Sequence, residues 1–120
     1  MIFGHVRDRF PRVSLSLPGR DGAVSVEFIV DTAFDGDLAL PSSLIAQLEA
    51  EVAEAQIIRF ADGTERERPR YELMLLWGDE ERITEVLALE NPPLLGVGLM
   101  EGHLIQAEMQ TGGEVSLERL

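Results

Sequence analysis

Alternating hydrophobic and polar residues run along much of the chain and predict short β-strands. Residues 13–17 alternate strictly, as Val-Ser-Leu-Ser-Leu, which is typical of a strand with one buried face. A turn with two glycines follows at 18–22, and residues 23–30 return as a second strand that ends in apolar residues. The two strands predict a hairpin that delivers Asp31 to its tip.

The same pattern continues through the rest of the chain. Asp62-Gly63 and Gly112-Gly113 predict two more hairpins, because these residues favour tight turns between strands. The return arm 65–70 is strongly charged and cannot be core, so the hairpin around Asp62 is expected to protrude into solvent. Further strands are predicted at 38–40, 56–60, 71–77, 82–89, 103–109 and 114–118, and a buried strand begins at Leu94. Helix is an alternative for the Leu- and Glu-rich strands, but their β-branched residues favour strands.

Helical spacing is rarer. After a helix start at 41–43, apolar residues recur every three or four positions, at Leu44, Ile45, Leu48 and Val52. This spacing predicts one helix that ends near Val52, and a short helical turn is expected at 99–102. Residues 1–12 are mixed and predict an N-terminal arm or edge strand, followed by one domain over 13–120. The fold class is therefore mostly β, with one or two short helices and the turn spacing of a closed barrel.

Composition narrows the function classes. The 120 residues carry a net charge of −12, and all ten basic residues are Arg. Such acidity argues against nucleic acid as a partner, since phosphates would be repelled. The negative charge is explained by solubility alone, and the alternative functional explanation is a weak preference for basic peptides. No apolar run approaches the roughly 18 residues that span a bilayer, and the first residues lack a signal peptide's apolar region. We expect a cytoplasmic protein without a membrane partner.

Asp31 is the strongest candidate for chemistry. A lone carboxylate at the end of a buried strand is unfavourable unless it is hydrogen-bonded or paired. The other candidate sites are weak. Neither His5 nor His103 has a metal-ligand partner at a suitable spacing, and Asp35-Gly36-Asp37 is too short for a calcium loop. Without cysteines there is no thiolate chemistry. We therefore expect no metal and no cofactor.

Two motifs resemble one protein family. The segment 28–41 reads apolar-apolar-Val-Asp-Thr-small-Phe-Asp-Gly-x-Leu-x-Leu-Pro and resembles the catalytic loop of the small, single-domain retropepsin-like aspartic proteases of prokaryotes. The segment 94–104 looks like that family's Leu-Leu-Gly-x-x-Leu-Leu-x-Gly sequence, and 61–64 falls where the family has the tip of its flap hairpin. The resemblance covers about 13–117 and implies a closed acid-protease barrel, one lobe per chain.

The resemblance also implies residue roles. Asp31 would be catalytic, and because the chain has one such motif, a homodimer would supply the second carboxylate for water-mediated hydrolysis of a peptide or protein substrate. Thr32 and Ala33 would support the loop, and Leu94, Leu95 and Gly96 would form the structural apolar-apolar-Gly motif. The flap residues that would close over substrate are Ala61, Asp62, Gly63 and Thr64.

The sequence allows more than one interpretation of the residues around Asp31 and of Ala33. Phe34, Asp35 and Asp37 are weak candidates for lining the cleft, and Asp35 and Asp37 are at least as well explained as solvated turn residues. Ala33 stands where the family usually has Gly, and a Cβ clashes where Gly uses positive φ or where substrate passes closely. The alternative function is therefore a retropepsin-like dimer of weak or absent activity that binds an extended peptide or a partner protein.

Overall fold

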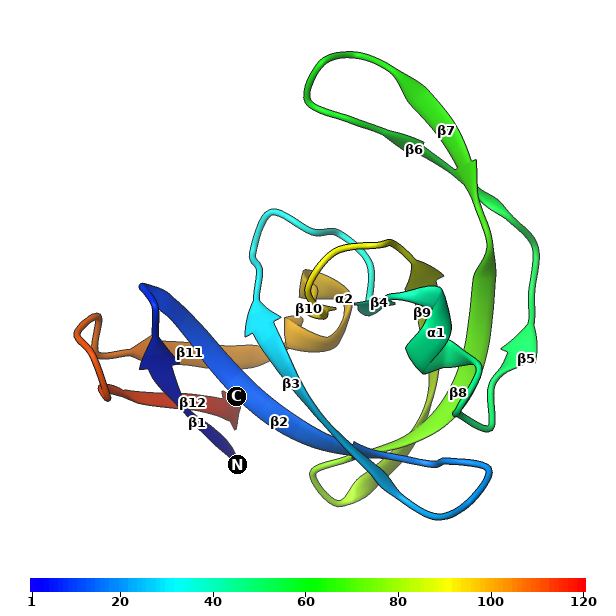
Figure 1. Ribbon diagram of the computed structural model, residues 1–120. Helices are drawn as coiled ribbons and strands as arrows, with labels where there is room; N and C mark the ends of the chain where they lie inside the picture. Colours follow the sequence, from blue (N-terminus) through cyan, green and yellow to red (C-terminus); the bar gives the residue numbers. More distant parts are fainter.

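Twelve strands and two helices of four residues each make up the chain in a computed structural model that describes residues 1–120 (Figure 1). The predicted mostly β class with one or two short helices is confirmed, and the helices number two. The elements are β1 (Ile2–Arg7), β2 (Phe10–Leu17), β3 (Val24–Val30), β4 (Leu38–Leu40), α1 (Ser42–Ile45), β5 (Glu51–Val52), β6 (Gln56–Arg59), β7 (Glu65–Arg68), β8 (Arg70–Trp77), β9 (Glu80–Ala88), β10 (Leu94–Leu95), α2 (Val97–Met100), β11 (His103–Ala107) and β12 (Glu114–Arg119).

Ten of the strands form one strongly curved sheet. Their order is β11-β12-β1-β2-β3-β10-β4-β9-β8-β5, and β6 pairs only with β7. The predicted closed barrel is wrong, because β11 and β5 are edges that do not pair with each other. The two ends of the sheet meet through side chains instead: the Trp77 indole on β8 donates to Nε2 of His103 on β11 at 3.1 Å. Arg119 of β12 also forms an ion pair with Glu80 of β9.

Strand alternation explains the core. In the β2–β3 hairpin, Val13 lies opposite Phe28 and Leu15 opposite Val26, and all four are buried, whereas Ser14 points outward. Burial of such apolar side chains is the main favourable term in folding. Buried residues from most of the large sheet and both helices join in a single cluster of 21 residues.

The N-terminal segment is an interior strand. β1 pairs with β12 on one side, where Ile2 lies opposite Leu117, and with β2 on the other, where Gly4 lies opposite Val13. Residues 1–12 are therefore neither a loose arm nor an edge strand, and β2 already begins at Phe10. Gly4 interrupts the hydrophobic pattern of β1, yet a Cβ there would lie 1.7 Å from the backbone O of Arg12, so only glycine fits between these strands.

Both helices differ from their predicted bounds. α1 ends at Ile45 instead of near Val52, because Leu48 pairs with Gly19 in an isolated bridge and the Glu49 amide donates to the Pro18 carbonyl at 2.9 Å. These bonds draw the chain toward the β2–β3 turn, and Val52 is 81% exposed in β5. α2 begins two residues before the predicted turn. Neither helix has the length and apolar character needed to cross a membrane.

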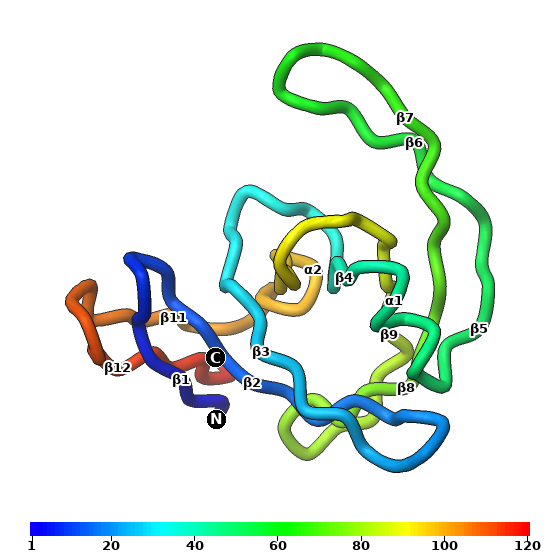
Figure 2. The backbone as a smooth tube through the Cα atoms, in the orientation of Figure 1, coloured from blue at the N-terminus to red at the C-terminus, as the bar shows by residue number.

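The β6–β7 hairpin stands away from the rest of the molecule, as the charged return arm predicts (Figures 1 and 2). Gln56 lies opposite Arg68 and Arg59 opposite Glu65, and neither strand pairs with the large sheet. The hairpin, together with the turn 60–64 that joins its strands, is called the flap below. It rises on the side of the molecule where the loop after β3 lies (Figure 2).

Candidate functional site

Asp31 follows directly on the buried strand β3. It lies at the open end of the β2–β3 hairpin and not at its tip, because the hairpin turn is at the other end of both strands. The Asp31 amide donates to the Leu95 carbonyl at 2.9 Å, which anchors the backbone. Its Oδ1 accepts a hydrogen bond of 2.9 Å from the Ala33 amide, and the residue is partly exposed. The carboxylate is thus held by its own loop and accessible from outside.

β10 enters the sheet between the two strands that flank the Asp31 loop. It runs parallel to β3, with Leu95 opposite Val30, and antiparallel to β4, with Leu95 opposite Leu38. The loop 31–37 therefore connects two strands that are separated by β10 and must pass over the end of that strand. The Leu94-Leu95-Gly96 motif and the Asp31 motif, far apart in sequence, are brought into direct contact.

Three backbone hydrogen bonds fix the loop on the segment after β10. Gly96 donates to Asp37 at 2.8 Å, Val97 to Phe34 at 2.8 Å and Gly98 to Gly36 at 3.0 Å. These bonds satisfy loop carbonyls that would otherwise depend on water. They hold the chain that follows Asp31, and the bond from the Asp31 amide to the Leu95 carbonyl holds the residue itself, so the carboxylate has a defined position relative to the sheet.

Glycine is required at the two ends of this contact for reasons of space. A Cβ on Gly96 would lie 2.1 Å from the carbonyl O of Gly36, and one on Gly98 would lie 2.2 Å from Oδ1 of Asp37. The Phe34 ring packs into the same contact, since a Cβ on Gly96 would lie 2.6 Å from its Cδ2. The Phe34 ring thus lies against both Gly36 and Gly96, while Asp35 is exposed.

Asp37 has a role that neither sequence alternative anticipated. Its Oδ2 accepts a hydrogen bond of 3.0 Å from the Glu85 amide, which ties the Asp31 loop to β9. It is therefore not a purely solvated turn residue. Asp-Gly-Asp is a common turn sequence, so the local pattern does not signal this distant partner.

The flap tip is a turn closed by its own side chains. Oδ1 of Asp62 accepts hydrogen bonds from the Thr64 amide at 2.9 Å and from the Thr64 hydroxyl at 2.6 Å. These bonds lower the pKa of the Asp62 carboxyl, the hydroxyl bond having the larger effect. Gly63 adopts φ +86°, which favours glycine. Ala61 and the other tip residues are exposed.

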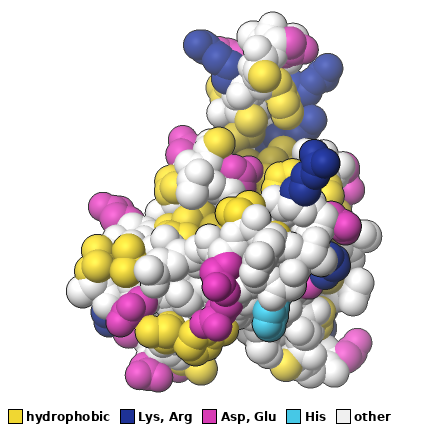
Figure 3. Space-filling view, turned by 90° about the vertical axis from the view of Figure 1, so that its left-hand side faces the viewer, with side chains coloured by type: hydrophobic (Ala, Val, Ile, Leu, Met, Phe, Trp, Pro, Cys, Tyr) yellow, Lys and Arg dark blue, Asp and Glu magenta, His cyan; other side chains and the backbone are white.

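Two open spaces of very different size lie between the flap and the body. At the flap base, Gln56 and Arg70 line a cavity of about 10 Å³ with Phe34 and Asp37. A larger hollow of about 340 Å³ lies between the flap and the segment after β9, and it is lined by Ser42, Phe60, Arg68, Pro69, Ala88, Leu89, Glu90 and Asn91. Figure 3 shows arginine and hydrophobic side chains on the hairpin where it rises above the body.

The two histidines lie outside this site. His103 binds Trp77 through Nε2, and its Nδ1 lies 3.0 Å from the Glu101 carbonyl, so both ring nitrogens have structural partners. His5 is exposed on β1. No group of three or more His, Asp or Glu side chains is arranged to hold a metal ion. The ionisable groups of the loop are the carboxylates of Asp31, Asp35 and Asp37, and that of Asp37 is bonded to β9.

Comparison of the chain with protein-family models, with curated proteins and with solved structures finds no match. The Asp31 loop, its support by β10 and the flap above it are therefore the features from which a function can be proposed.

Proposed function

We propose that this chain is one subunit of a homodimeric aspartic endopeptidase of retropepsin-like fold, with Asp31 as the catalytic residue. The observation that carries the proposal is the position of Asp31, at the end of a buried strand in a loop that three hydrogen bonds fix to 96–98. Catalytic groups need such a fixed position, because small misplacements lower rates strongly. The flap, which rises on the same side of the molecule, supports the proposal as a cover for an extended peptide.

The dimer supplies the second carboxylate. Two Asp31 side chains that meet across a two-fold axis share one proton, since like charges at close range cannot both ionise easily. The ionised carboxylate takes a proton from water as the water oxygen attacks the peptide carbonyl carbon, and the protonated carboxyl gives its proton to the carbonyl oxygen. The tetrahedral gem-diol then collapses: the C–N bond breaks, the leaving nitrogen takes up the proton that the pair holds, and one hydroxyl of the diol returns its proton to the pair as the C=O bond re-forms. No covalent adduct with the enzyme forms.

The loop residues suit these roles. Thr32 is exposed beside Asp31, where it is free to hydrogen-bond with the second subunit. Ala33 replaces the family's usual glycine, yet it is not among the residues with positive φ, which apart from glycines are Asp8 and Arg9. Its amide already serves Asp31, and a methyl group does not change that bond. The substitution is therefore compatible with an active loop.

A second candidate is a dimer that binds an extended peptide without hydrolysing it. The exposed Ala33 methyl group favours this alternative, because it lies on the loop surface over which a substrate backbone would pass. Both candidates use the same flap, whose backbone would pair with the peptide by strand addition. They differ only in turnover.

Substitution of Asp31 tests the enzyme directly. In the Asp31→Asn variant, cleavage of a peptide library between pH 4 and 8, a range that spans carboxylate titration and neutrality, is expected to fall by about 10²–10⁴-fold because the general base is lost. Asp21→Asn, the same change in the exposed β2–β3 turn, is the matched control and should cleave like the wild type.

The dimer is tested on the same samples. Light scattering should give about twice the mass of the 13.3 kDa chain for the wild type and for both variants. Undiminished cleavage by Asp31→Asn, or cleavage by a strict monomer, would contradict the proposed enzyme. Saturable peptide binding by a wild-type dimer that never cleaves would support the binding candidate instead.

A further inference from the structure

The two faces of the flap carry different side chains. Gln56 lies directly opposite Arg68, and Ile58 opposite Arg66. Residues that oppose each other share a face of a strand pair, and faces alternate along each strand. One face therefore carries Gln56, Ile58, Phe60, Arg66 and Arg68, and the other carries Ile57, Arg59, Glu65 and Glu67.

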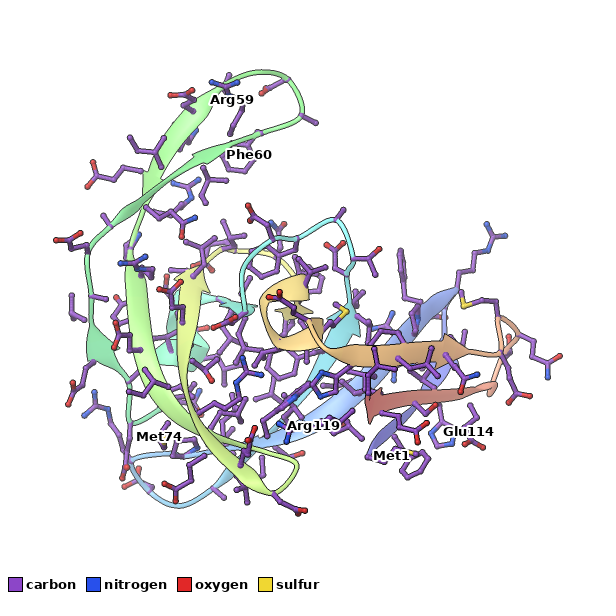
Figure 4. All side chains as sticks on the ribbon, turned by 180° about the vertical axis from the view of Figure 1, so that it is seen from behind. Met1, Arg59, Phe60, Met74, Glu114 and Arg119 are labelled. Atoms are coloured by element: carbon purple, nitrogen blue, oxygen red, sulfur yellow. The ribbon has the colours of Figure 1, made fainter.

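The face with Phe60 and Arg68 is the inner face. Both residues line the 340 Å³ hollow together with Leu89, Glu90 and Asn91 of the body. Gln56, on the same face, lines the small cavity beside Phe34. Figure 4 shows Phe60 on the side of the hairpin that faces the rest of the molecule and Arg59 on the outer side.

The inner face is positive and its charges are not neutralised. It carries two arginines and no acidic residue, and neither Arg66 nor Arg68 forms a salt bridge, whereas Arg59 on the outer face pairs with Glu65 at 2.6 Å. The Arg68 guanidinium lies over the Phe60 ring, 5.7 Å from its centroid, which holds it toward the hollow.

Glu90, across the hollow from Arg68, is already engaged. Its Oε1 accepts a hydrogen bond of 2.9 Å from the Ser42 amide. Hydrogen bonding by the Ser42 side chain, then by its amide, and last the charge of Arg68 lower the pKa of the Glu90 carboxyl. None of the salt bridges joins Glu90 to Arg68, so the guanidinium donors are free for another acceptor. The inner face of the flap therefore presents the positive charges of Arg66 and Arg68 to an open space, in a chain whose net charge is −12.

We propose that the flap selects peptides with a glutamate or aspartate side chain, which Arg66 and Arg68 bind from above. A guanidinium binds a carboxylate through two parallel hydrogen bonds, and the hollow is large enough for one or more side chains. Arg70 is not part of this subsite, since its cavity of about 10 Å³ holds one water molecule at most. The negative charge of the whole chain acts weakly here, because salt screens distant charges beyond about 8–10 Å. The inference rests on the proposed function only in that the peptide lies beneath the flap.

Binding to the Asp31→Asn variant tests selectivity without requiring cleavage. The probes are capped decapeptides, taken from the tightest-binding sequence of a randomised library and synthesised with Glu, Gln or Arg at each position in turn. At one position the Glu peptide should bind about tenfold more tightly than the Gln peptide, as for a hydrogen-bonded charge pair. The preference should weaken as salt is raised.

Variants of the flap assign the preference to its inner face. Arg66→Gln with Arg68→Gln should abolish the preference for Glu, whereas Arg59→Gln, on the outer face of the same hairpin, should retain it. Three results would each overturn the inference. They are equal or tighter binding of the Gln or Arg peptides, a preference for Glu that survives in the double variant, and no peptide binding in the millimolar range. These experiments measure binding and not hydrolysis. A wild-type protein that cleaves no peptide would therefore refute the proposed enzyme, whereas the selectivity of the flap would still be decided by the measured affinities.

Discussion

At the scale of single residues, the contact between the Asp31 loop and 96–98 leaves no room for side chains. The two glycines in it are not equivalent. Gly96 faces the carbonyl O of Gly36, a backbone atom that cannot rotate away, whereas Gly98 first meets the flexible side chain of Asp37 and only then Gly36 O, at 3.0 Å. Gly96 has φ −102°, which any residue adopts, so space alone decides the effect of a substitution there.

We expect Gly96→Ala to destabilise the fold by about 3 kcal/mol or more and Gly98→Ala by about 1–2 kcal/mol, within the range of overpacked sites. The Asp37 side chain can move to admit the second methyl group, but Gly36 can admit the first only if the loop shifts. Urea unfolding, followed through the midpoint and slope, measures both effects. A Gly98→Ala variant that is as unstable as Gly96→Ala would show that the Asp37 side chain is rigid.

At the scale of elements, the flap is a two-stranded ribbon outside the main sheet, and such ribbons are marginally stable alone. Its turn depends on the two hydrogen bonds that Asp62 accepts from Thr64. Because these bonds lower the pKa of Asp62 in the folded turn, their contribution is present above the ordinary Asp pKa and is lost as the pH falls through the lower folded value.

We therefore expect the Thr64 amide proton to shift in NMR spectra as the solution is acidified, with a midpoint below about 3.9, the value of a free Asp side chain. In Asp62→Asn, which keeps an acceptor but does not titrate, this shift should be absent. A midpoint at or above the free value would mean that the bonds to Thr64 do not form in solution.

Strands and hairpins could be predicted from local sequence, whereas the end of the first helix and the position of β1 could not. Alternation in β2, β3 and β12 and the turn residues Asp62-Gly63 were sufficient to predict strands and hairpins, because both depend on neighbouring residues. Leu44 to Val52 has helical spacing, but long-range bonds from Glu49 and Leu48 end the helix early. The interior position of β1 depends on Gly4, and this glycine interrupts the hydrophobic pattern by which the strand could have been predicted.

The candidate site divides in the same way. Asp31 could be selected from sequence, because a carboxylate after a buried strand is conspicuous. Family resemblance singled out the motif beginning at Leu94 but did not predict its contact with the Asp31 loop. The bond from Glu85 to Asp37 and the insertion of β10 between β3 and β4 could not be predicted, because local pattern does not encode pairing between distant strands. The charge of the flap's inner face likewise required the strand register.

At the scale of the whole molecule, the two ends of the curved sheet are joined by side-chain contacts and not by backbone hydrogen bonds between strands. Trp77 is 3% exposed, and its indole N–H has His103 as its acceptor. The ring of His103 meets that of Trp77 edge-on, with centroids 5.6 Å apart. Since Nδ1 of His103 faces the Glu101 carbonyl, the proton lies on that nitrogen and Nε2 accepts.

We expect His103→Phe to destabilise the protein by about 1–3 kcal/mol, because the ring contact remains but a buried N–H loses its acceptor. His103→Gln, which offers a carbonyl oxygen, should lose less than half as much. Trp77 is the only tryptophan, so its fluorescence during urea unfolding reports on this contact. Equal stability of the wild type and His103→Phe would show that the N–H finds another acceptor.

The insertion of β10 also sets an order of events during synthesis. The β2–β3 hairpin can form as soon as residues 10–30 have emerged, but the Asp31 loop has no partner until 94–98 follow. Contacts between such distant segments form late, since the intervening chain must first be ordered. An unfinished chain thus carries the Asp31 carboxylate without the support that positions it, and the proposed hydrolysis begins only after residues 94–98 have left the ribosome.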